Sequence, residues 1–282
     1  MKQVSSLEEY QFLVKKNKTE KKAKKTNCLL FPDAIQRYIS NERFYCEEQK
    51  AGIFFFADEG RYYQAWFYLN PEVPAEKRKW EKPVLIQHYY TEKNRDRDQD
   101  AYSQLENAGF RHMDTMQHFI VDDEKAVRKI RPLARYAEKI LTENGFSYRP
   151  PEDSELPLVD ELIDMTPEIP FYLMNWYNEE EFREMREEGR FTGIFSKSGE
   201  LCAAQQFFVA GNILNGWVVV KKDYRETYGM SVFLKEKVCD YAIEHHCVHS
   251  GWIDLNNTVS RRYHQNVGFE AVDRYLDNWV CC

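Results

Sequence analysis

Several features that would mark a membrane-bound, secreted or metal-dependent protein are missing from this sequence. No stretch approaches 18 consecutive apolar residues, and the opening MKQVSSLEEYQFL is too polar for a signal peptide. The seven cysteines form no CxxC pair and have no metal-ligand spacing with histidine, so we expect free thiols and no metal. A reducing, cytoplasmic setting is the simplest compartment for such a chain.

Positive charge is also scarce. The formal net charge is −7 at pH 7, which argues against general nucleic-acid binding because phosphate contacts need a basic surface. The exception is local, since seven lysines crowd between positions 15 and 25. They fit either a contact with RNA, a membrane or an anionic ligand, or a solvated helix face. From the acidic total we expect no nucleic-acid and no membrane partner.

The N-terminal half alternates helical and strand-like segments. Helical patterns occupy residues 6–16, a second segment that begins at Pro32, and a third, charged segment that ends near Gly109. Apolar runs of strand length occupy residues 51–57, 62–69 and 83–90. Asp58-Glu59-Gly60 separates the first two runs and predicts an antiparallel hairpin.

The length of 282 residues favours two domains of about 130 to 150 residues each. Apolar residues recur at three- and four-residue steps from 124 to 144, which predicts an amphipathic helix. Prolines between 150 and 157 favour extended chain after it. We therefore expect a domain over 1–123, a connecting helix and linker over 124–150, and a second domain over 151–282.

An internal repeat links the two halves. NAGFRHMD at 107–114 matches NVGFEAVD at 266–273, which lies 159 residues later. In both places a helix is expected to lead into a strand. The second half is expected to run as helices, three strands, a helix, a strand, a helix and a strand. We infer a duplicated fold. The alternative is that two unrelated helices end in similar sequences.

Two segments of the second half carry a recognisable pattern. DYRETYGMS at 223–231 follows a valine-rich strand and opens an amphipathic helix. Amide groups at a helix N-terminus lack intrahelical partners and lie at the positive end of the dipole, so they can hold a pyrophosphate. The second segment, NTVSRRYHQNVGF at 257–269, follows at the expected distance. Together they resemble the acyl-CoA loop and the next helix of the GNAT superfamily of N-acetyltransferases, although the first alone also fits an ordinary strand, turn and helix.

The resemblance implies an α/β fold of two tandem GNAT-like domains, each with a central mixed, largely antiparallel sheet flanked by helices. It implies acetyl-CoA as co-substrate and acyl transfer to a primary amine by direct attack on the thioester. The cofactor contacts it implies are Trp217, Val218, Val220, Arg225, Tyr228, Gly229, Met230, Ser231 and Asn257. Arg225 lies one position early for the family pattern. Two other functions stay open: a non-catalytic acyl-CoA-binding relic, and an aminoacyl-tRNA-dependent transferase.

The same resemblance suggests a proton donor for the departing thiolate. The family commonly uses a tyrosine on the helix of the second segment. Counting along that segment puts His264 at this position, whereas Tyr263 has the family's residue type one step away, so both are candidates. No general base is evident, and His249 is one of several conceivable residues.

The acceptor is expected to be a small-molecule or peptide amine. Tyr172, Trp176 and Glu179 combine aromatic and acidic side chains that suit a cationic, partly apolar ligand. Acidic residues at a helix N-terminus are also what the helix dipole favours, which is the structural alternative. We expect the chain to be a monomer or a homodimer.

The N-terminal half lacks what an anion-binding loop needs. No glycine occurs between Gly60 and Gly109, and Pro71 and Pro74 stand between the second and third apolar runs. That connection is too short for a loop and a full helix. We therefore expect this half to be a degenerate copy that does not bind acyl-CoA in the family manner.

Overall fold

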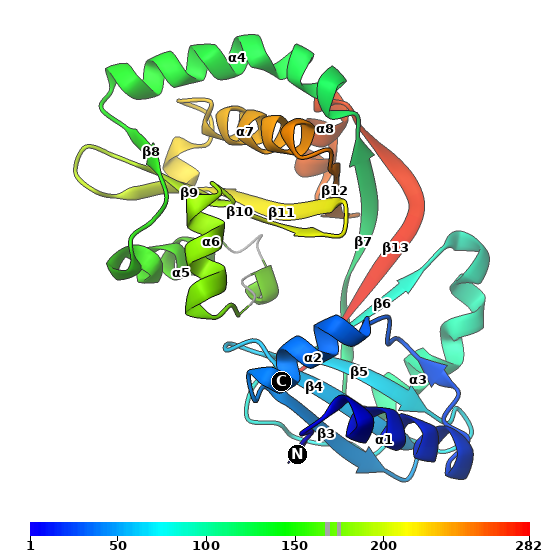
Figure 1. The fold of residues 1–282 in the computed structure, drawn as a ribbon. Coiled ribbons are helices and arrows are strands. Elements are labelled where there is room, and N and C mark those ends of the chain that lie inside the picture. Colours follow the sequence, from blue (N-terminus) through cyan, green and yellow to red (C-terminus); the bar gives the residue numbers. More distant parts are fainter. Residues whose placement is uncertain (167–169, 174–175) are drawn as a thin grey trace. The chain divides into compact units, whose positions relative to one another are not determined.

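The chain forms two compact units (Figure 1). The computed structural model describes residues 1–166, 170–173 and 176–282, without the side chains of 96–99 and 173. Of the described residues, unit 1 holds Met1–Gln117, Trp176 and Asp273–Cys282, and unit 2 holds the rest. Among the described helices, none is both long and apolar enough to cross a membrane.

Unit 1 is a sheet with helices on both faces. Its helices are α1 (Leu7–Glu20), α2 (Pro32–Ser40), the 3-10 helix η1 (Glu92–Asp98) and α3 (Gln99–Ala108). Its strands are β1 (Lys2–Gln3), β2 (Lys25–Thr26), β3 (Phe44–Gln49), β4 (Gly52–Asp58), β5 (Tyr63–Leu69), β6 (Val84–Tyr90) and parts of β7 (Arg111–Val121) and β13 (Phe269–Cys281). The strand order is β1-β3-β4-β5-β6-β13-β7, and β2 pairs with β5.

Alternation along β4 explains why both faces of this sheet are covered. Phe54 and Phe56 pack with Leu105 of α3, whereas Phe55 packs with Tyr10 of α1. Successive side chains of a strand point to opposite faces, so a strand that is apolar throughout needs helices on both sides. The predicted hairpin is confirmed, because β4 and β5 pair antiparallel along their whole length.

Unit 2 is a second mixed sheet with its own helices. Its helices are α4 (Asp123–Glu143), α5 (Leu156–Asp164), α6 (Glu179–Glu187), α7 (Met230–Glu244), α8 (Thr258–Val267) and the 3-10 helices η2 (Asp153–Glu155), η3 (Phe171–Leu173) and η4 (Lys222–Tyr224). Its strands are β8 (Ser147–Arg149), β9 (Phe191–Phe195), β10 (Leu201–Ala210), β11 (Ile213–Val220) and β12 (Val248–Asp254). Strands β8 to β11 pair antiparallel in sequence order, and β11 pairs with β12 in parallel.

The long helix α4 belongs to the core of unit 2, although the sequence suggested a connecting helix over 124–150. Ala137 and Leu141 of α4 pack against Met230 and Leu234 of α7, and the two helices lie side by side in Figure 1. Periodicity predicts that a helix has an apolar face, and it does not say which core that face joins. The boundary between the units therefore falls before α4, at Gln117 and His118.

The C-terminal end of the chain also departs from the expected division. A single domain was expected over 151–282, but Asp273–Cys282 belongs to unit 1. There β13 pairs antiparallel with β6, from Tyr275↔Tyr90 to Cys281↔Val84. The physical reason is the length of β13, whose 13 residues begin in unit 2 and supply an inner strand to the sheet of unit 1.

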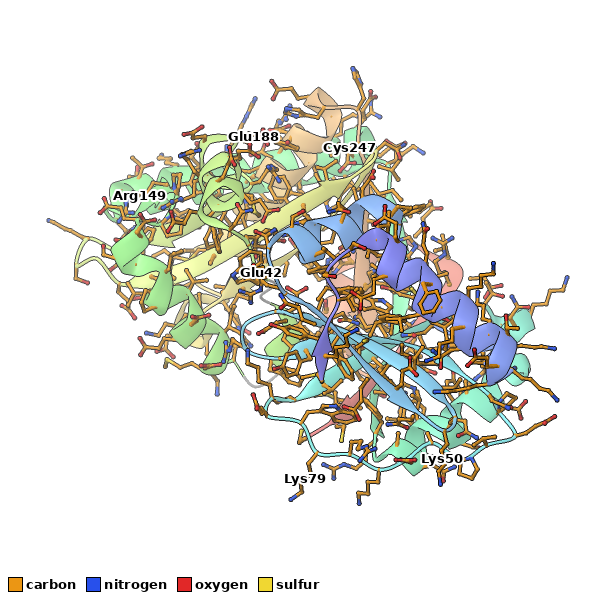
Figure 2. All side chains as sticks on the ribbon, turned by 60° about the horizontal axis from the view of Figure 1, so that its bottom comes forward. Glu42, Lys50, Lys79, Arg149, Glu188 and Cys247 are labelled. Atoms are coloured by element: carbon orange, nitrogen blue, oxygen red, sulfur yellow. The ribbon has the colours of Figure 1, made fainter. Side chains whose placement is uncertain are left out.

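The proline-bearing segment after β8 is ordered by a specific ion pair. Both guanidinium amino groups of Arg149, labelled in Figure 2, donate to the Glu155 carboxylate at 2.6 Å. Such a bidentate pair fixes the direction of the chain as well as its distance. The segment expected to be a linker is thus the rigid entry into η2 and α5.

The repeat marks the same structural transition in both halves. Gly109 follows α3 and Gly268 follows α8, and both adopt positive φ, at 96° and 114°. A glycine in this conformation ends a helix without steric cost and redirects the chain into a strand, here β7 and β13. The expected α/β class, with a mixed sheet flanked by helices in each of two units, is confirmed.

Candidate functional site

The parallel strands β11 and β12 of unit 2 pair only at their beginning. They are in register at Ile213↔Val248 and Leu214↔His249, and no later pair joins them among the described residues. On its other edge β11 pairs with β10 as far as Val220↔Ala203. The part of β11 after Leu214 is therefore held in a sheet on one side, while its backbone groups on the β12 side have no strand partner.

Helix α7 follows β11 and begins at a residue that only glycine suits. Gly229 precedes the helix with φ of 65°, and a Cβ there would lie 2.9 Å from Cβ of Ala137 in α4. The left-handed backbone and the close approach both disfavour a side chain. Met230, the first residue of α7, is fully buried and packs with Ala137 and Leu141 of α4.

The amide groups at this helix start have no internal acceptor. In the described part of the chain, no hydrogen bond is made by the backbone N–H groups of Gly229, Met230 and Ser231. No side chain caps α7, and its first turn contains no acidic residue. In α6, by contrast, Asn178 and Glu181 form a capping box. The positive end of α7 is thus free to hold an anion.

The connection from β11 to α7 is held in place by a set of polar contacts. Lys221 and Tyr224 both bond to the carboxylate of Glu200, and the Tyr224 hydroxyl lies 2.9 Å away from it. Arg225, predicted as a cofactor contact, donates from Nε to the carbonyl of Val220 at 3.0 Å. The ring of Tyr228 packs 4.9 Å from that of Phe146. The loop therefore reaches Gly229 along a fixed path.

The predicted residues of β11 contribute their side chains to packing. Val218 and Val220 pack in the core beneath α7, and the indole N–H of Trp217 donates to Gln206 Oε1 at 3.1 Å. These three residues nevertheless belong to the part of β11 that β12 does not pair. Lys221 N–H donates to the carbonyl of Cys202 in β10, so by alternation the backbone groups of Trp217 also face β10, while those of Val218 and Val220 face away from it. The backbone N–H groups of Val218 and Val220 are what this part of β11 can offer to a ligand.

The two candidate proton donors on α8 have different surroundings. The Tyr263 hydroxyl lies 3.3 Å from the carbonyl of Ser231, at the helix start described above. Burial raises the pKa of Tyr263, so the phenol keeps its proton. His264 Nδ1 lies 2.8 Å from the Ser260 carbonyl, and burial lowers the pKa of His264 to about 3. Its imidazole is neutral near pH 7, donates Nδ1–H to that carbonyl and leaves Nε2 without a proton.

Asn257, the remaining predicted cofactor contact, is the N-cap of α8. Its side-chain oxygen accepts from the backbone N–H of Ser260 at 3.0 Å. This bond satisfies one of the free donors of the helix start. The structure thus gives Asn257 a local structural task.

The three predicted acceptor residues are divided between the units. Trp176 belongs to unit 1, where its ring lies 3.9 Å from the guanidinium carbon of Arg43 and its backbone N–H donates to Glu59. Tyr172 is buried in unit 2, and Glu179 is an exposed first residue of α6. Sequence proximity suggested a single site, which these positions do not show.

The lysine-rich segment of unit 1 makes internal contacts. Lys16 and Lys21 form ion pairs with Glu48 at 3.1 and 3.5 Å, and the Lys18 ammonium lies 4.8 Å from the centre of the Tyr68 ring. These contacts favour a structural use of the segment over steering of RNA.

His249 of β12, considered as a base, is buried and bonded elsewhere. Its Nδ1 lies 2.9 Å from Oδ1 of Asp123, and burial lowers the pKa of His249 to about 4. Sequence reasoning missed its neighbours Asp123 and Cys239, because they come from helices more than 100 residues apart. An acceptor amine could not reach a ring that is 3% exposed.

Comparison with known proteins gives similarity at the level of the fold. No family model matches the sequence, and no curated protein sequence matches it. A solved structure of a GCN5-related glucosamine N-acetyltransferase region, from a fungal multi-domain β-N-acetylglucosaminidase, aligns with a TM-score of 0.50 at 9% identity, covering 81% of this chain and 31% of that one.

Two other solved structures align over most of both chains. A putative GNAT-family acetyltransferase from Novosphingobium aromaticivorans gives a TM-score of 0.49 at 14% identity, over 80% of this chain and 87% of that one. A tandem GNAT protein from the clavulanic acid biosynthesis pathway gives 0.45 at 13% identity, over 85% and 83%. The parted β11–β12 pair, the start of α7 and the overall similarity to the glucosamine N-acetyltransferase region together show that the chain has the GNAT fold.

Proposed function

We propose that unit 2 is an acyl-CoA-dependent N-acyltransferase, with acetyl-CoA as its donor and a primary amine as its acceptor. The observation that carries the proposal is the start of α7. Three consecutive amides, from Gly229 to Ser231, have no acceptor among the described residues, and they follow a strand whose own partner has parted from it. A diphosphate suits the first feature, and an extended amide-bearing arm suits the second.

The residues present fit such a donor. The amides of Gly229, Met230 and Ser231 would hold the diphosphate, and the backbone N–H groups of Val218 and Val220 would hold the arm, while Trp217 keeps its backbone paired with β10. The acyl-CoA supplies an activated thioester carbonyl. A backbone N–H of β11 directed at that carbonyl oxygen would stabilise the charge that develops there.

The chemistry requires three proton movements. The ammonium form of the acceptor first loses a proton, and the neutral amine attacks the carbonyl carbon to form a C–N bond. The attached nitrogen then loses its second proton, the C–S bond breaks, and the thiolate leaves with the electron pair and gains a proton. Both candidates on α8 carry a proton near pH 7, but the His264 proton is donated to Ser260 within the same helix, whereas the Tyr263 hydroxyl lies beside Ser231 at the start of α7. We therefore assign the donor role to Tyr263.

Ligand-induced stabilisation tests the binding half of the proposal. At a hundredfold excess over Kd, CoA or acetyl-CoA should add about 2.7 kcal/mol to the free energy of unfolding, measured as a thermal shift. Replacing Gly229 is a poor test, because a side chain there would press on Ala137. Ser231→Asp is better: a carboxylate in the first turn favours the helix but repels a diphosphate.

The matched control is Ser231→Asn, which has the same size without the charge. We expect Ser231→Asp to weaken CoA binding by about tenfold or more and Ser231→Asn to leave most of the shift. A wild-type protein that shows no shift with either ligand would refute the proposal.

Thiol release on adding amines tests the chemical half. A panel of small-molecule and peptide amines should contain acceptors that release CoA, and Tyr263→Phe should lower kcat by about a hundredfold. The KM for acetyl-CoA should stay nearly unchanged in this variant, because only a structural loss at the α7 start would raise it. Stable binding without transfer to any amine would instead favour the non-catalytic relic.

A further inference from the structure

A second group of reactive side chains lies in unit 2, away from the α7 start. Asp123 is the first residue of α4, Cys239 lies in α7 and His249 lies in β12. Their ligand atoms lie within 4.8 Å of one another. Cys239 is fully buried, and the side chains of His249 and Asp123 are 4% and 8% exposed. Three elements thus bring a thiol, an imidazole and a carboxylate to one buried point.

The spacing of these atoms resembles the edges of a metal tetrahedron. Zinc ligand distances of about 2.0 to 2.3 Å place neighbouring ligand atoms about 3.3 to 3.8 Å apart. Cys239 Sγ lies 3.8 Å from His249 Nδ1, which already meets this requirement. His249 Nδ1 and Asp123 Oδ1 are 2.9 Å apart because they share a proton. They need to separate by only a few tenths of an ångström once an ion replaces that proton.

We propose that Asp123, Cys239 and His249 form a binding site for a divalent transition metal of the zinc type. A thiolate with an imidazole and a carboxylate is a donor set that suits Zn²⁺ or Co²⁺, whereas Mg²⁺ and Ca²⁺ prefer oxygen ligands. Three protein ligands leave a fourth position for water. Binding releases the thiol proton of Cys239 to solvent and moves the single proton of the neutral His249 ring from Nδ1 to Nε2.

One neighbouring group opposes a cation at this point. Lys235 interacts electrostatically with both Cys239 and Asp123. Burial lowers the pKa of Lys235, so its charged form is the one that the surroundings disfavour. The net charge also balances with an ion bound, because the thiolate and the carboxylate together neutralise a divalent cation.

The place of the cluster gives the ion a structural task. His249 is the last residue of β12 that pairs with β11, at Leu214. An ion there would tie the start of α4 and the middle of α7 to the point where the two strands part. A metal bound only by the folded chain stabilises it by mass action. The site does not depend on acyl transfer, so it can exist whether or not unit 2 is an enzyme.

Cobalt spectroscopy on the full chain tests the site directly. The reduced protein is stripped with a chelator and titrated with Co²⁺ without oxygen. We expect a thiolate-to-cobalt charge-transfer band and the visible bands of tetrahedral Co²⁺, saturating at one equivalent and lost on adding Zn²⁺. Wild-type protein without a thiolate band at one equivalent would overturn the proposal.

Two serine variants separate this site from binding at other thiols. Cys239→Ser should abolish the charge-transfer band, whereas Cys202→Ser, another fully buried thiol of unit 2, should keep it. Circular dichroism melting of each apo variant checks that the fold persists. A band of equal strength in Cys239→Ser assigns the ion to another cysteine and removes the proposal. A band lost with a folded apo protein supports it.

Discussion

The two units differ most at an equivalent place, where two parallel strands part. In unit 1, β5 and β6 are in register up to Ala65↔Ile86, and in unit 2, β11 and β12 are in register up to Leu214↔His249. Both pairs then lose their register among the described residues. The strand geometry that suits an extended ligand is therefore common to both halves.

In unit 1 the chain itself occupies the parted strands. β2 pairs with β5 at Thr26↔Tyr68. The next residue, Asn27, is buried and donates to the carbonyls of Ala65 and Gln87, while its oxygen accepts from the N–H of Phe67. Ala65 is the last residue of β5 paired with β6, so Asn27 joins the two strands where they separate. The backbone groups that a ligand would use are already satisfied.

The connection that follows the first strand of each parallel pair, β5 in unit 1 and β11 in unit 2, also differs between the units. Between β5 and β6 the residues 70–83 form no helix, whereas β11 leads through η4 into α7. Unit 1 thus has the parted strands without the amides of a helix start, and its own segment replaces the ligand. The comparison teaches that the two sheets share the parted strands, and that binding capacity depends on what fills the space beside them.

The largest expected effect comes from removing the part of β13 that belongs to unit 1. Deleting 273–282 takes an inner strand from unit 1, together with the buried Leu276 and Trp279. Exposed edges of β6 and β7 and a lost core should leave unit 1 unfolded. Hydrogen exchange followed by mass spectrometry should show protection lost in unit 1 and kept in α7 and β11.

The same deletion asks which unit binds CoA. If the truncated protein still gives a CoA-dependent protection at residues 229–231, the binding unit is unit 2. Loss of protection in unit 2 to the same degree as in unit 1 would contradict the division proposed here. A Cys282→Ser variant controls for loss of the exposed terminal thiol alone.

The next effect concerns Asn27, which joins β5 and β6 of unit 1 where the two strands separate. Asn27→Ala leaves two carbonyls and one N–H without partners in a buried place. Each unsatisfied buried group costs about 1 to 3 kcal/mol, so unit 1 should lose about 3 kcal/mol in denaturant unfolding. Thr26→Ser, which keeps the β2 backbone pairing, should stay within about 0.5 kcal/mol.

This variant also tests the expectation that unit 1 does not bind CoA. We expect no CoA response in unit 1 after Asn27→Ala, because the parted strands there still lack a helix start. A CoA-dependent protection of β5 in the variant would show that the occupant alone excludes the ligand.

The sequence predicted most elements, because they depend on local patterns. The apolar runs predicted β4, β5 and β6, and the period of α4 was plain from Val127 to Leu141. The assignment of α4 to unit 2 and of the end of β13 to unit 1 could not be predicted, since both depend on pairing between residues far apart. The short connection between the second and third apolar runs correctly indicated that no full helix lies between β5 and β6, but Asn27 carried no recognisable pattern.

The candidate site shows the same limit. Gly229 was predicted from the resemblance to the family's loop, yet its contact with Ala137 requires a helix nearly 100 residues earlier. The surroundings of Tyr263 and His264 depend on Ser231 and on burial, which sequence does not give. Asn257 fitted a family pattern, and only the structure shows its bond to Ser260. The cofactor contacts themselves stay predictions.

An effect of moderate size is expected in the pH dependence of stability, which should have opposite signs in the two units. His264 in unit 2 has a pKa lowered to about 3, so the unfolded chain binds its proton first as the pH falls below 6.5. Unit 2 should lose up to about 2 kcal/mol between pH 6.5 and 5 from this ring. In unit 1, burial raises the pKa of Glu59, so the folded form takes up a proton first and acidification favours it.

Segment-resolved hydrogen exchange at pH 7, 6 and 5 measures both trends. His264→Gln should reduce the loss in unit 2, where the lowered pKa of His249 contributes a further loss of the same sign, and Glu59→Gln should flatten the gain in unit 1. Parallel changes in the two units would contradict the opposite signs. A chelator in all samples excludes metal binding at His249 as a cause.

The smallest expected effect concerns the loop that leads to α7. Glu200 holds Lys221 and Tyr224, but its side chain is 38% exposed, so its ion pair should contribute less than about 1 kcal/mol to stability. Glu200→Gln loosens the path to Gly229 and should weaken CoA binding by about two- to fivefold in calorimetry, with the melting temperature of the free protein nearly unchanged.

Unit 1 offers a matched control for this change, because Asp58 holds Lys82 and Arg43 in a similar way before β6. Asp58→Asn should cost a comparable amount of stability and leave CoA affinity unchanged. Equal loss of affinity in both variants would mean that the loop order near Gly229 has no special role. A loss confined to Glu200→Gln follows only if the ligand is held by amides whose position that loop determines, since an ion pair this exposed does little else.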